Sequence, residues 1–257
     1  MNSVLPSNKL PPPAVSVIIP AVNESATLQP ILAAIRSRLV TFETIVVDGC
    51  SSDQTTAIAQ ASGARVVSSS CRQRAYQSNL GAHQARGEIL LFLHADTVLP
   101  DGALDQIVHA LQDSHVVGGA FARRYASPSR VLRFTCFLAR CRNRLIGWHL
   151  GDQAMFVRRA VFFQLGGFRE VDLFEDLDFS RRLKKFGRLV TLLPCVISSS
   201  RRFMSAGPAR TTLRDFFLTV RYLFRGLEPE RREIQHTSDL KSPKVSDIHN
   251  VGIIPGE

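Results

Sequence analysis

The sequence predicts an α/β fold with a mostly parallel central sheet flanked by helices. Two observations support this prediction. Short, almost wholly apolar segments alternate in the first half of the chain with segments whose apolar residues recur at helical spacing. Strands that are apolar throughout must be covered on both faces of their sheet, which is typical of parallel strands joined by helices. At 257 residues the chain is long enough for one large domain of this class.

The first half of the chain is predicted to contain four strands and three helices. Pro20 ends the first strand, because proline cannot donate a hydrogen bond to a sheet. Asn23 and Glu24 precede one helix, and Ser51 to Asp53 cap the next. The predicted strands cover residues 15–20, 44–47, 65–67 and 88–93, and the predicted helices cover residues 25–38, 53–61 and 74–85.

After residue 115 the regular alternation ends. Apolar residues at helical spacing from Leu213 to Leu227, with arginines off that face, predict a late amphipathic helix. The other elements expected here are strands at 116–125, a strongly basic helix at 129–150, a loop entering a strand at 151–157, a helix that includes Arg181 and Arg182, and a strand at 189–196.

The net charge of +10 is concentrated in the second half of the chain. Residues 1–120 contain 7 Lys and Arg against 9 Asp and Glu, whereas residues 121–257 contain 25 against 13. A basic half indicates an anionic partner, which is a phosphate compound, an acidic membrane surface or a nucleic acid. A basic surface that is merely solvated is the alternative.

Cysteine usage and hydropathy predict a cytoplasmic location. The five cysteines are scattered and form no CxxC pair, which is typical of a reduced chain without a disulfide framework or a zinc site. The Pro-rich N-terminus has no apolar signal core, and no apolar run approaches the roughly 20 residues that span a bilayer. Peripheral contact with the inner face of the cell membrane stays open.

Carboxylates concentrate at two sites. Glu175, Asp176 and Asp178 occupy three of four positions between apolar residues, so their negative charges repel one another. A chain tolerates this repulsion on a solvated surface, or where a cation or a proton transfer uses the charge. About 80 residues earlier, Asp96 follows the apolar strand at 88–93. Open α/β sheets bind their ligands at the carboxyl ends of strands. The two sites therefore predict an active site.

Four motifs, in this order and at this spacing, resemble the family 2 glycosyltransferases. They are Pro20-Ala21-Val22-Asn23-Glu24, Val46 to Asp53, Leu93-His94-Ala95-Asp96-Thr97, and Glu175-Asp176. The resemblance covers roughly residues 14–203. It implies the GT-A fold, a nucleotide-sugar donor with a UDP-sugar as the first choice, a divalent cation (Mg²⁺ or Mn²⁺), and inversion at the anomeric carbon.

Within that family the chain is more similar to a bacterial subgroup whose genes neighbour radical-SAM and selenium-related domains. The residues that match this subgroup are Val47-Asp48-Gly49, His94 to Thr97, Gly118 to Phe121, Gly151 to Ala154, and Arg201-Arg202. Some such chains are also similar to the glucosyltransferase that esterifies the carotenoid acid diaponeurosporenoate. A carotenoid acid or another lipid-like acceptor is what this likeness implies.

On the donor side, the resemblance makes Asp96 the metal ligand, with His94 standing where the family signature has its first aspartate. His94 is then expected at the ribose or the phosphates, and Glu24 at the ribose. A strand-end turn cap is the alternative for Asp96, and simple helix capping is the alternative for Asn23 and Glu24. The remaining residues assigned to the nucleotide-sugar are Pro20, Ala21, Asn23, Asp48, Arg74, Asn79 and Ala95, with Arg72 in the same crevice.

On the acceptor side, the resemblance makes Asp176 the general base, and like charges around it favour a raised pKa that helps it accept a proton. Glu175 orients the acceptor or the base. Asp178 is assigned to structure, as a partner of Arg181 or Arg182 three or four residues later. Gly151, Asp152 and Gln153 are expected to shape the acceptor side, and Arg201 and Arg202 to hold the leaving diphosphate, since guanidinium groups suit phosphate.

The predicted organisation follows from these assignments. It consists of a flexible lead-in at 1–13, one domain at 14–205 with a nucleotide-binding half (14–115) and an acceptor half (116–205), a basic amphipathic helix at 206–232, and a disordered tail at 233–257. Residues 129–148 and 210–227 combine apolar and arginine-rich faces, which are typical of helices that lie in a lipid headgroup layer. Packing of both apolar faces on the domain is the alternative.

The sequence also bears on other possible functions. A dinucleotide-dependent dehydrogenase is disfavoured, because no GxGxxG follows the first strand. A nucleotidyltransferase of similar fold stays open, although the Gly-, Arg- and Lys-rich loop that it needs after the first strand is absent. We expect no nucleic-acid partner, since no binding motif is present and only three Tyr and one Trp are available for stacking. A non-catalytic protein that binds anionic surfaces also stays open, if His94 prevents metal binding.

Overall fold

The structure is a computed structural model, and it describes residues 12–225. The elements in chain order are β1 (Val15–Ala21), α1 (Ser25–Ala34), β2 (Phe42–Asp48), α2 (Thr55–Ala61), β3 (Arg65–Ser68), α3 (Arg74–Gln84), β4 (Ile89–Phe92), β5 (Thr97–Val98), α4 (Ala103–Ala110), β6 (Val116–Tyr125), α5 (Arg130–Leu145), the 3₁₀ helix η1 (Gly151–Gln153), β7 (Met155–Arg158), α6 (Arg159–Gln164), α7 (Glu175–Leu183), β8 (Arg188–Ser198), α8 (Arg201–Ala206) and α9 (Pro208–Arg225). The lead-in up to residue 11, the end of the expected late helix and the expected tail lie outside the described residues.

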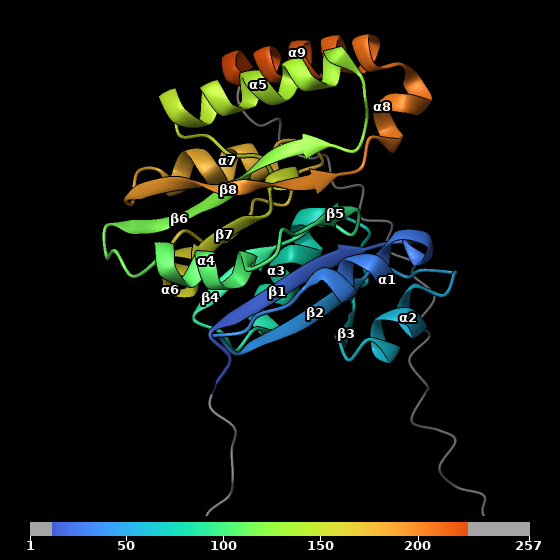
Figure 1. The fold of residues 1–257 in the computed structure, drawn as a ribbon, viewed down its shortest axis with the longest axis vertical. Coiled ribbons are helices and arrows are strands. Elements are labelled where there is room, and N and C mark those ends of the chain that lie inside the picture. Colours follow the sequence, from blue (N-terminus) through green and yellow to red (C-terminus); the bar gives the residue numbers. More distant parts are fainter. Residues whose placement is uncertain (1–11, 226–257) are drawn as a thin grey trace, which may run out of the picture.

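The strands of the described part form one eight-stranded sheet in the order β3-β2-β1-β4-β7-β6-β8-β5 (Figure 1). β3, β2, β1 and β4 are all parallel, as expected from the apolar segments that alternate with helices in this half of the chain. β7 is antiparallel to both β4 and β6, β8 is parallel to β6, and β5 is antiparallel to β8. The prediction of a mostly parallel sheet flanked by helices is confirmed.

Each face of the sheet has its own apolar core, because successive side chains of a strand point to opposite faces. On one face, Val17 and Ile19 of β1 pack with Leu28 of α1 and Leu104 of α4. On the other face, Ile18 of β1 joins a second cluster. The helical members of that second cluster are Ala75 and Ala82 of α3, Phe162 of α6, and Phe179 and Leu183 of α7.

Two predicted helices are shorter in the structure. α1 ends at Ala34 and not at residue 38, because Ser37 turns the chain: its hydroxyl donates to Asp105 at 2.5 Å and accepts the Val40 amide at 2.9 Å. α5 ends at Leu145 and not at residue 150. Gly147 has a φ of 74°, and its amide donates to the carbonyls of Arg142 and Asn143, which is a glycine-dependent helix end. The short elements β5, α4, α6 and α8 have no counterpart in the sequence prediction.

α5 and α9 lie side by side and form a layer on the far side of β6 and β8 from the parallel half (Figure 1). α8 connects β8 to this layer. None of the helices in the part of the chain that the structure describes is long and apolar enough to cross a membrane.

Gly119 allows β6 and β8 to approach closely. A Cβ atom added there would overlap the Val190 carbonyl oxygen and lie 3.0 Å from the Phe156 ring. The obstructing atom is backbone, so it cannot swing aside. We expect Gly119→Ala to lower the free energy of unfolding by about 3 kcal/mol or more in urea titrations.

Gly102→Ala is the matched control. Gly102 has a φ of 69° with no atom close to an added Cβ, so its substitution introduces backbone strain without overlap. We expect it to cost about 1 kcal/mol. Equal costs for the two variants would show that the β6–β8 contact does not depend on the missing side chain.

Candidate active site

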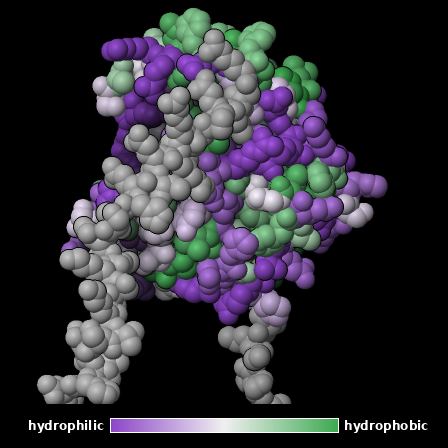
Figure 2. All heavy atoms as spheres, turned by 180° about the vertical axis from the view of Figure 1, so that it is seen from behind, coloured by the Kyte–Doolittle hydropathy of each residue, from purple (hydrophilic) through white to green (hydrophobic). Residues whose placement is uncertain are grey.

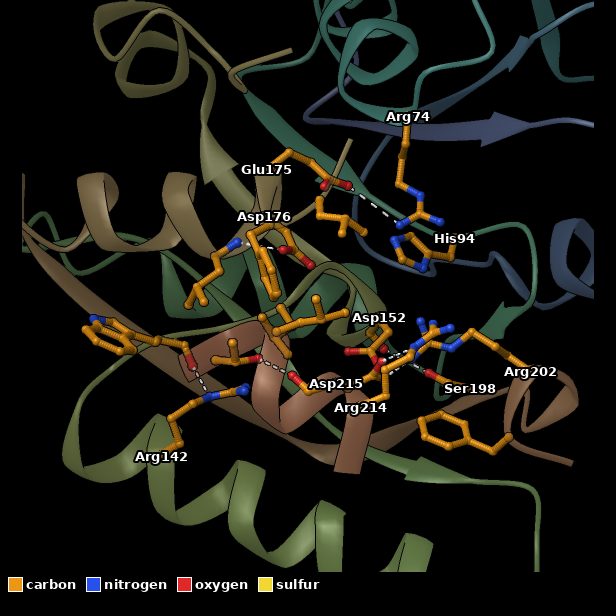
Figure 3. A pocket seen from close by; sticks show the side chains of 18 of the residues that line it. Arg74, His94, Arg142, Asp152, Glu175, Asp176, Ser198, Arg202, Arg214 and Asp215 are labelled. Atoms are coloured by element: carbon orange, nitrogen blue, oxygen red, sulfur yellow. Dashed lines mark hydrogen bonds and ion pairs between the residues drawn. The ribbon is translucent and has the colours of Figure 1, made fainter. Parts of the chain in front are cut away.

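A cavity of about 750 Å³ lies between the carboxyl end of β4 and the helices α5, α7 and α9 (Figure 3). Its polar lining residues include Arg74, His94 and Asp96 from the parallel half and Asp152 and Asp176 from the second half. Eight apolar residues also line it, and they are Ile146, Trp148, Leu150, Leu173, Phe174, Leu177, Leu218 and Leu223. The two acidic sites of the sequence are therefore brought to one cavity.

The loops after β1 and β2 hold one another in place. The Asn23 amide donates to the Ser51 hydroxyl, and the Ser52 amide donates to the Asn23 side-chain oxygen, both at 2.9 Å. The Glu24 amide donates to the Thr55 hydroxyl at 2.8 Å. Asn23 thus fixes the loop, while the Glu24 carboxylate points across to the second half of the chain, where it accepts a hydrogen bond from Arg201 at 2.8 Å.

Asp48 ends β2 and is buried, with one carboxylate oxygen left open. Its Oδ2 accepts the Ser51 amide at 3.0 Å, whereas its Oδ1 has no hydrogen-bond partner in the structure. A buried acceptor without a partner is unfavourable unless a ligand completes it. Nearby, Arg72 donates to the carbonyls of Gly49 and Cys50 and so braces the turn after β2. Ala21 is buried beside this turn, and its carbonyl accepts the Gly49 amide.

His94 follows β4 and is held neutral. Burial first, and the positive charge of Arg74 second, lower the pKa of His94 to about 3. A Cβ atom added at Gly151 would lie 2.8 Å from the His94 Nε2 atom, so only glycine allows η1 to approach this ring. His94 therefore contributes a neutral imidazole to the cavity, at the position where the family signature would place a second carboxylate beside Asp96.

Asp96 faces Arg201 across the mouth of the cavity. Burial raises the pKa of Asp96, and the Arg201 guanidinium, with a nitrogen 3.7 Å from Oδ2, acts in the opposite direction. The same guanidinium nitrogen donates to Glu24 at 2.8 Å. Two carboxylates that are far apart in sequence thus share one cationic group. In the part of the chain that the structure describes, no group of three or more His, Cys, Asp or Glu side chains is placed to hold a metal ion.

Asp176 and Glu175 occupy the first turn of α7. Phe174, which precedes the helix, adopts a left-handed conformation with φ 67°. Asp176 accepts the Gly151 amide on Oδ2 and the Leu177 amide on Oδ1, both at 2.6 Å. Burial is the first cause of a raised pKa for both carboxyl groups, and the charge of Asp176 adds to it at Glu175. Arg74 lies 3.6 Å from Glu175 and opposes the shift.

Asp152 is kept ionised by a buried arginine that the sequence prediction missed. Burial alone would raise the pKa of Asp152, but the Arg123 guanidinium, which pairs with its Oδ2, lowers it. The Tyr125 hydroxyl donates to the same oxygen at 3.3 Å, and Oδ1 has no partner in the structure. Arg123 and Tyr125 end the apolar strand β6. Polar side chains at the end of an apolar strand are the signal that could have identified them, as it identified Asp96.

Several predicted residues support the site without lining the main cavity. Gln153 is buried, donates to the Phe121 carbonyl and accepts from Arg142 at 2.9 Å, so it anchors the loop around Asp152. Asn79, which the prediction assigned to the nucleotide-sugar, uses both of its polar atoms in hydrogen bonds with the backbone of Phe168, at 2.8 and 2.9 Å. Pro20 lies on a smaller hollow beside His94 and Asp176.

Asp178 of α7 and Asp215 of α9 each pair with an arginine. Asp178 pairs with Arg182 at 2.7 Å, which confirms the assignment of Asp178 to structure. Arg202 lines the cavity and pairs with Asp215 of α9, and Arg214 of α9 lies 3.8 Å from the same carboxylate. α9 therefore contributes directly to the cavity wall, which the sequence did not indicate.

Residues 16–164 match the family described as Glycosyl transferase family 2. An uncharacterised protein of Mycobacterium tuberculosis, MT1568, is 32% identical over 203 residues, which are 66% of this chain and 62% of that protein. The 4,4'-diaponeurosporenoate glycosyltransferase of Staphylococcus haemolyticus is 33% identical over 105 residues, which are 38% of this chain and 28% of that protein. The chain thus spans less than two thirds of the length of either relative.

The fold is also found among solved structures. The mannosyltransferase PcManGT from Pyrobaculum calidifontis, in complex with GDP-Man and Mn²⁺, superimposes with a TM-score of 0.59 at 22% sequence identity. The superposition covers 73% of this chain and 56% of that one. This likeness extends over the sheet and its helices and agrees with the architecture described above.

Proposed function

The chain belongs to glycosyltransferase family 2 and has the GT-A fold, and from this premise we propose that it transfers a sugar from a nucleotide-diphosphate donor, a UDP-sugar, to an acceptor with inversion. One observation supports this above the others: Asp176, with its raised pKa, shares a cavity with Asp96 at the carboxyl end of the parallel strands. A proton acceptor and a group that can hold an activated donor are thus within reach of one substrate.

The donor is proposed to lie over the carboxyl ends of β1, β2 and β4. The open Oδ1 atom of Asp48 can accept a hydrogen bond from the base or the ribose, and Glu24 can do the same for a ribose hydroxyl. Arg74 and the neutral His94 lie where ribose or phosphate groups would pass. We keep the division into a nucleotide-binding half (14–115) and an acceptor half (116–205) as part of this proposal.

A thermal-shift panel tests the donor proposal. The protein is heated with UDP-, GDP-, ADP- and TDP-sugars, each with and without Mn²⁺. Preferential stabilisation by a UDP-sugar is the expected result, because a ligand that binds only the folded state raises its stability by an amount that grows with the logarithm of the ligand concentration divided by Kd. Stabilisation by no nucleotide-sugar under any condition would contradict the proposed function.

A divalent cation, Mg²⁺ or Mn²⁺, fits the residues at the cavity mouth. Asp96 offers a hard carboxylate oxygen that is partly exposed, and Glu24 shares with it the Arg201 cation, so positive charge is already stabilised at this point. Asp96 would hold the cation, with donor phosphates as further ligands. When bound, such a cation neutralises the charge that develops on the leaving diphosphate. Arg201 and Arg202 are proposed to add their charge to the same group.

Arg201 competes with the cation in this arrangement. We expect Arg201→Gln to raise the affinity for Mn²⁺ in the absence of nucleotide by about fivefold, since an exposed ion pair is worth about 1 kcal/mol at most. Mn²⁺ binding is measured by electron paramagnetic resonance. Arg202→Gln is the control, because Arg202 pairs with Asp215 and not with Asp96. Lower Mn²⁺ affinity in Arg201→Gln would show that no competition exists.

Asp176 is proposed to deprotonate the acceptor in a single displacement. The acceptor oxygen bonds to the anomeric carbon as the bond from that carbon to the diphosphate oxygen breaks, and the acceptor proton moves to Asp176. The Gly151 and Leu177 amides fix the Asp176 carboxylate for this step. Glu175 and Asp152 flank it, and Asp152, held by Arg123, is proposed to orient the acceptor on the opposite side.

The acceptor is proposed to be lipid-like, because eight apolar side chains line the cavity that also contains Asp96 and Asp176. A carotenoid acid is one compound of this chemistry, and it fits the relative whose name contains 4,4'-diaponeurosporenoate. Such an acceptor is available at a membrane, so we place the protein in the cytoplasm, in peripheral contact with the inner face of the cell membrane. Transfer to water-soluble acceptors alone, with none to amphiphilic ones, would refute this part of the proposal.

A further inference from the structure

The outward surfaces of α5 and α9 expose many large apolar side chains. This set, here called the α5–α9 face, comprises Val131, Phe134, Phe137, Leu138, Leu145 and Ile146 from α5 and its end, and Leu213, Phe216, Phe217, Leu223 and Phe224 from α9. Apolar side chains gather at the same end of the molecule in Figure 2. Monomeric proteins rarely expose so many large apolar groups on one surface unless it contacts a partner. The inner residues of the two helices, such as Leu132 and Tyr222, are buried against the rest of the protein. The α5–α9 face is the side of the two helices that this packing does not cover.

Within the described residues of α5 and α9, the charges are almost all positive. α5 contains five arginines and no acidic residue, and α9 contains four arginines and one acidic residue, Asp215. Asp215 is already paired with Arg202. Among the arginines, Arg130, Arg133, Arg140, Arg144 and Arg210 are exposed. The partner that fits such a surface has an apolar interior for the exposed apolar side chains and an anionic surface for the arginines.

A second copy of the chain does not fit this description. Two α5–α9 faces packed together by a twofold axis would bring arginines against arginines, with no acidic residue outside the Arg202 pair to compensate. An anionic bilayer supplies both requirements, because its headgroups are negative and its acyl chains are apolar.

The α5–α9 face continues into the cavity. Ile146 and Leu223 line the cavity and are also 40% and 41% exposed on the face. α9 also supplies Leu218 and Thr219 to the cavity lining, which includes Trp148. The cavity is therefore continuous with the face at Ile146 and Leu223.

We propose that the α5–α9 face docks on an anionic bilayer, and that the acyl chain of a membrane lipid enters the cavity from the leaflet between Ile146 and Leu223. This inference rests on the lipid-like acceptor of the proposed function. It adds an orientation of the protein on the membrane and a route by which the apolar part of the acceptor reaches the site without crossing water.

Docking is tested by co-sedimentation with vesicles of phosphatidylcholine, alone or with 30% phosphatidylglycerol, at low and high salt. The full chain is expected to bind the anionic vesicles at low salt and to lose affinity at high salt. Each arginine near an anionic leaflet changes binding roughly fivefold. The triple substitution Arg130→Gln, Arg133→Gln, Arg210→Gln should therefore weaken binding to anionic vesicles about 100-fold, and Arg36→Gln with Arg38→Gln, outside the face, should leave it unchanged.

The apolar contribution needs its own variants. Phe134→Ser with Phe217→Ser removes two exposed rings from the face and should weaken binding at both salt concentrations. Leu39→Ser is the control, since Leu39 is as exposed but lies between α1 and β2. Unchanged thermal unfolding of each variant shows that the fold is kept. Absence of binding by the unmodified chain to anionic vesicles at low salt would overturn the proposal, and so would equal losses in the face variants and their controls.

Entry of an acyl chain is tested through Trp148, the one tryptophan in the sequence. Phosphatidylglycerol with brominated acyl chains quenches tryptophan only at short range, so its vesicles should quench Trp148 if a chain enters the cavity. Leu223→Arg places a charge at the entrance and should abolish quenching while vesicle binding persists. Binding without any quenching of Trp148 in the unmodified chain would overturn the route.

These results are separable from the proposed function. Vesicle binding and Trp148 quenching without release of UDP from a UDP-sugar would contradict the proposed glycosyl transfer and support the docking. UDP release without vesicle binding would contradict the docking and support the glycosyl transfer.

Discussion

Asp176→Asn is expected to lower turnover by about 10²–10⁴-fold while leaving donor affinity nearly unchanged, because general base catalysis contributes about this factor. Asparagine keeps the size of the side chain and can still accept the Gly151 amide on its oxygen, so the loop around η1 should stay in place. The measurement is kcat for UDP release in the presence of acceptor, together with the nucleotide-sugar dissociation constant from calorimetry.

Asp178→Asn is the matched control, two residues along the same helix. Asp178 pairs with Arg182 and Arg169 and is not among the residues that line the active-site cavity, so its substitution should lower the stability of α7 without changing kcat per folded molecule. The opposite pattern, with a loss at Asp178 and none at Asp176, would move the catalytic base to Asp178.

The same base sets the pH dependence. Burial raises the pKa of Asp176, and only the deprotonated form accepts a proton. Turnover should therefore fall as the pH drops through this raised pKa, at a higher pH than for an ordinary aspartate. His94 is neutral over the whole range in which this happens, because its pKa is lowered to about 3. The acid limb of the kcat profile should thus be lost in Asp176→Asn and retained in Asp178→Asn.

Asp96→Asn is expected to abolish the Mn²⁺-dependent stabilisation by the donor and to lower metal-dependent turnover by about 10²-fold or more, since a metal ion contributes several kcal/mol to charge stabilisation. Burial already disfavours the charged form of Asp96, so the fold loses little when the charge is removed. The comparison of melting temperatures with the donor, with and without Mn²⁺, measures the effect directly.

Asp101→Asn is the control for the second substitution. Asp101 is exposed and lies five residues beyond Asp96. It should behave like the unmodified protein in both measurements. Full Mn²⁺-dependent turnover in Asp96→Asn would show that the cation is bound elsewhere or is not used.

The sequence by itself determined the parallel half of the sheet and the position of its polar ends. The segments around β1, β2 and β4 are mostly apolar, and only a sheet covered on both faces buries them. Asp48 and Asp96 directly follow such segments, so their placement at one edge of the sheet is a local property of the chain. The pairing of Asp178 with Arg182 is equally local, since it spans one helical turn.

The tertiary structure alone decided which distant side chains meet. Arg201 reaches Glu24 across 177 positions of sequence, and Arg123 of β6 neutralises Asp152 of η1. Asn79 shows the converse: the sequence placed it at the nucleotide, but its amide is used by the backbone of Phe168. Periodicity likewise identified α5 and α9 as amphipathic, yet it cannot tell which apolar side chains are buried. Burial depends on what packs against a helix, and here β6 packs against α5, α8 packs against α9, and the two helices contact each other, which leaves the α5–α9 face exposed.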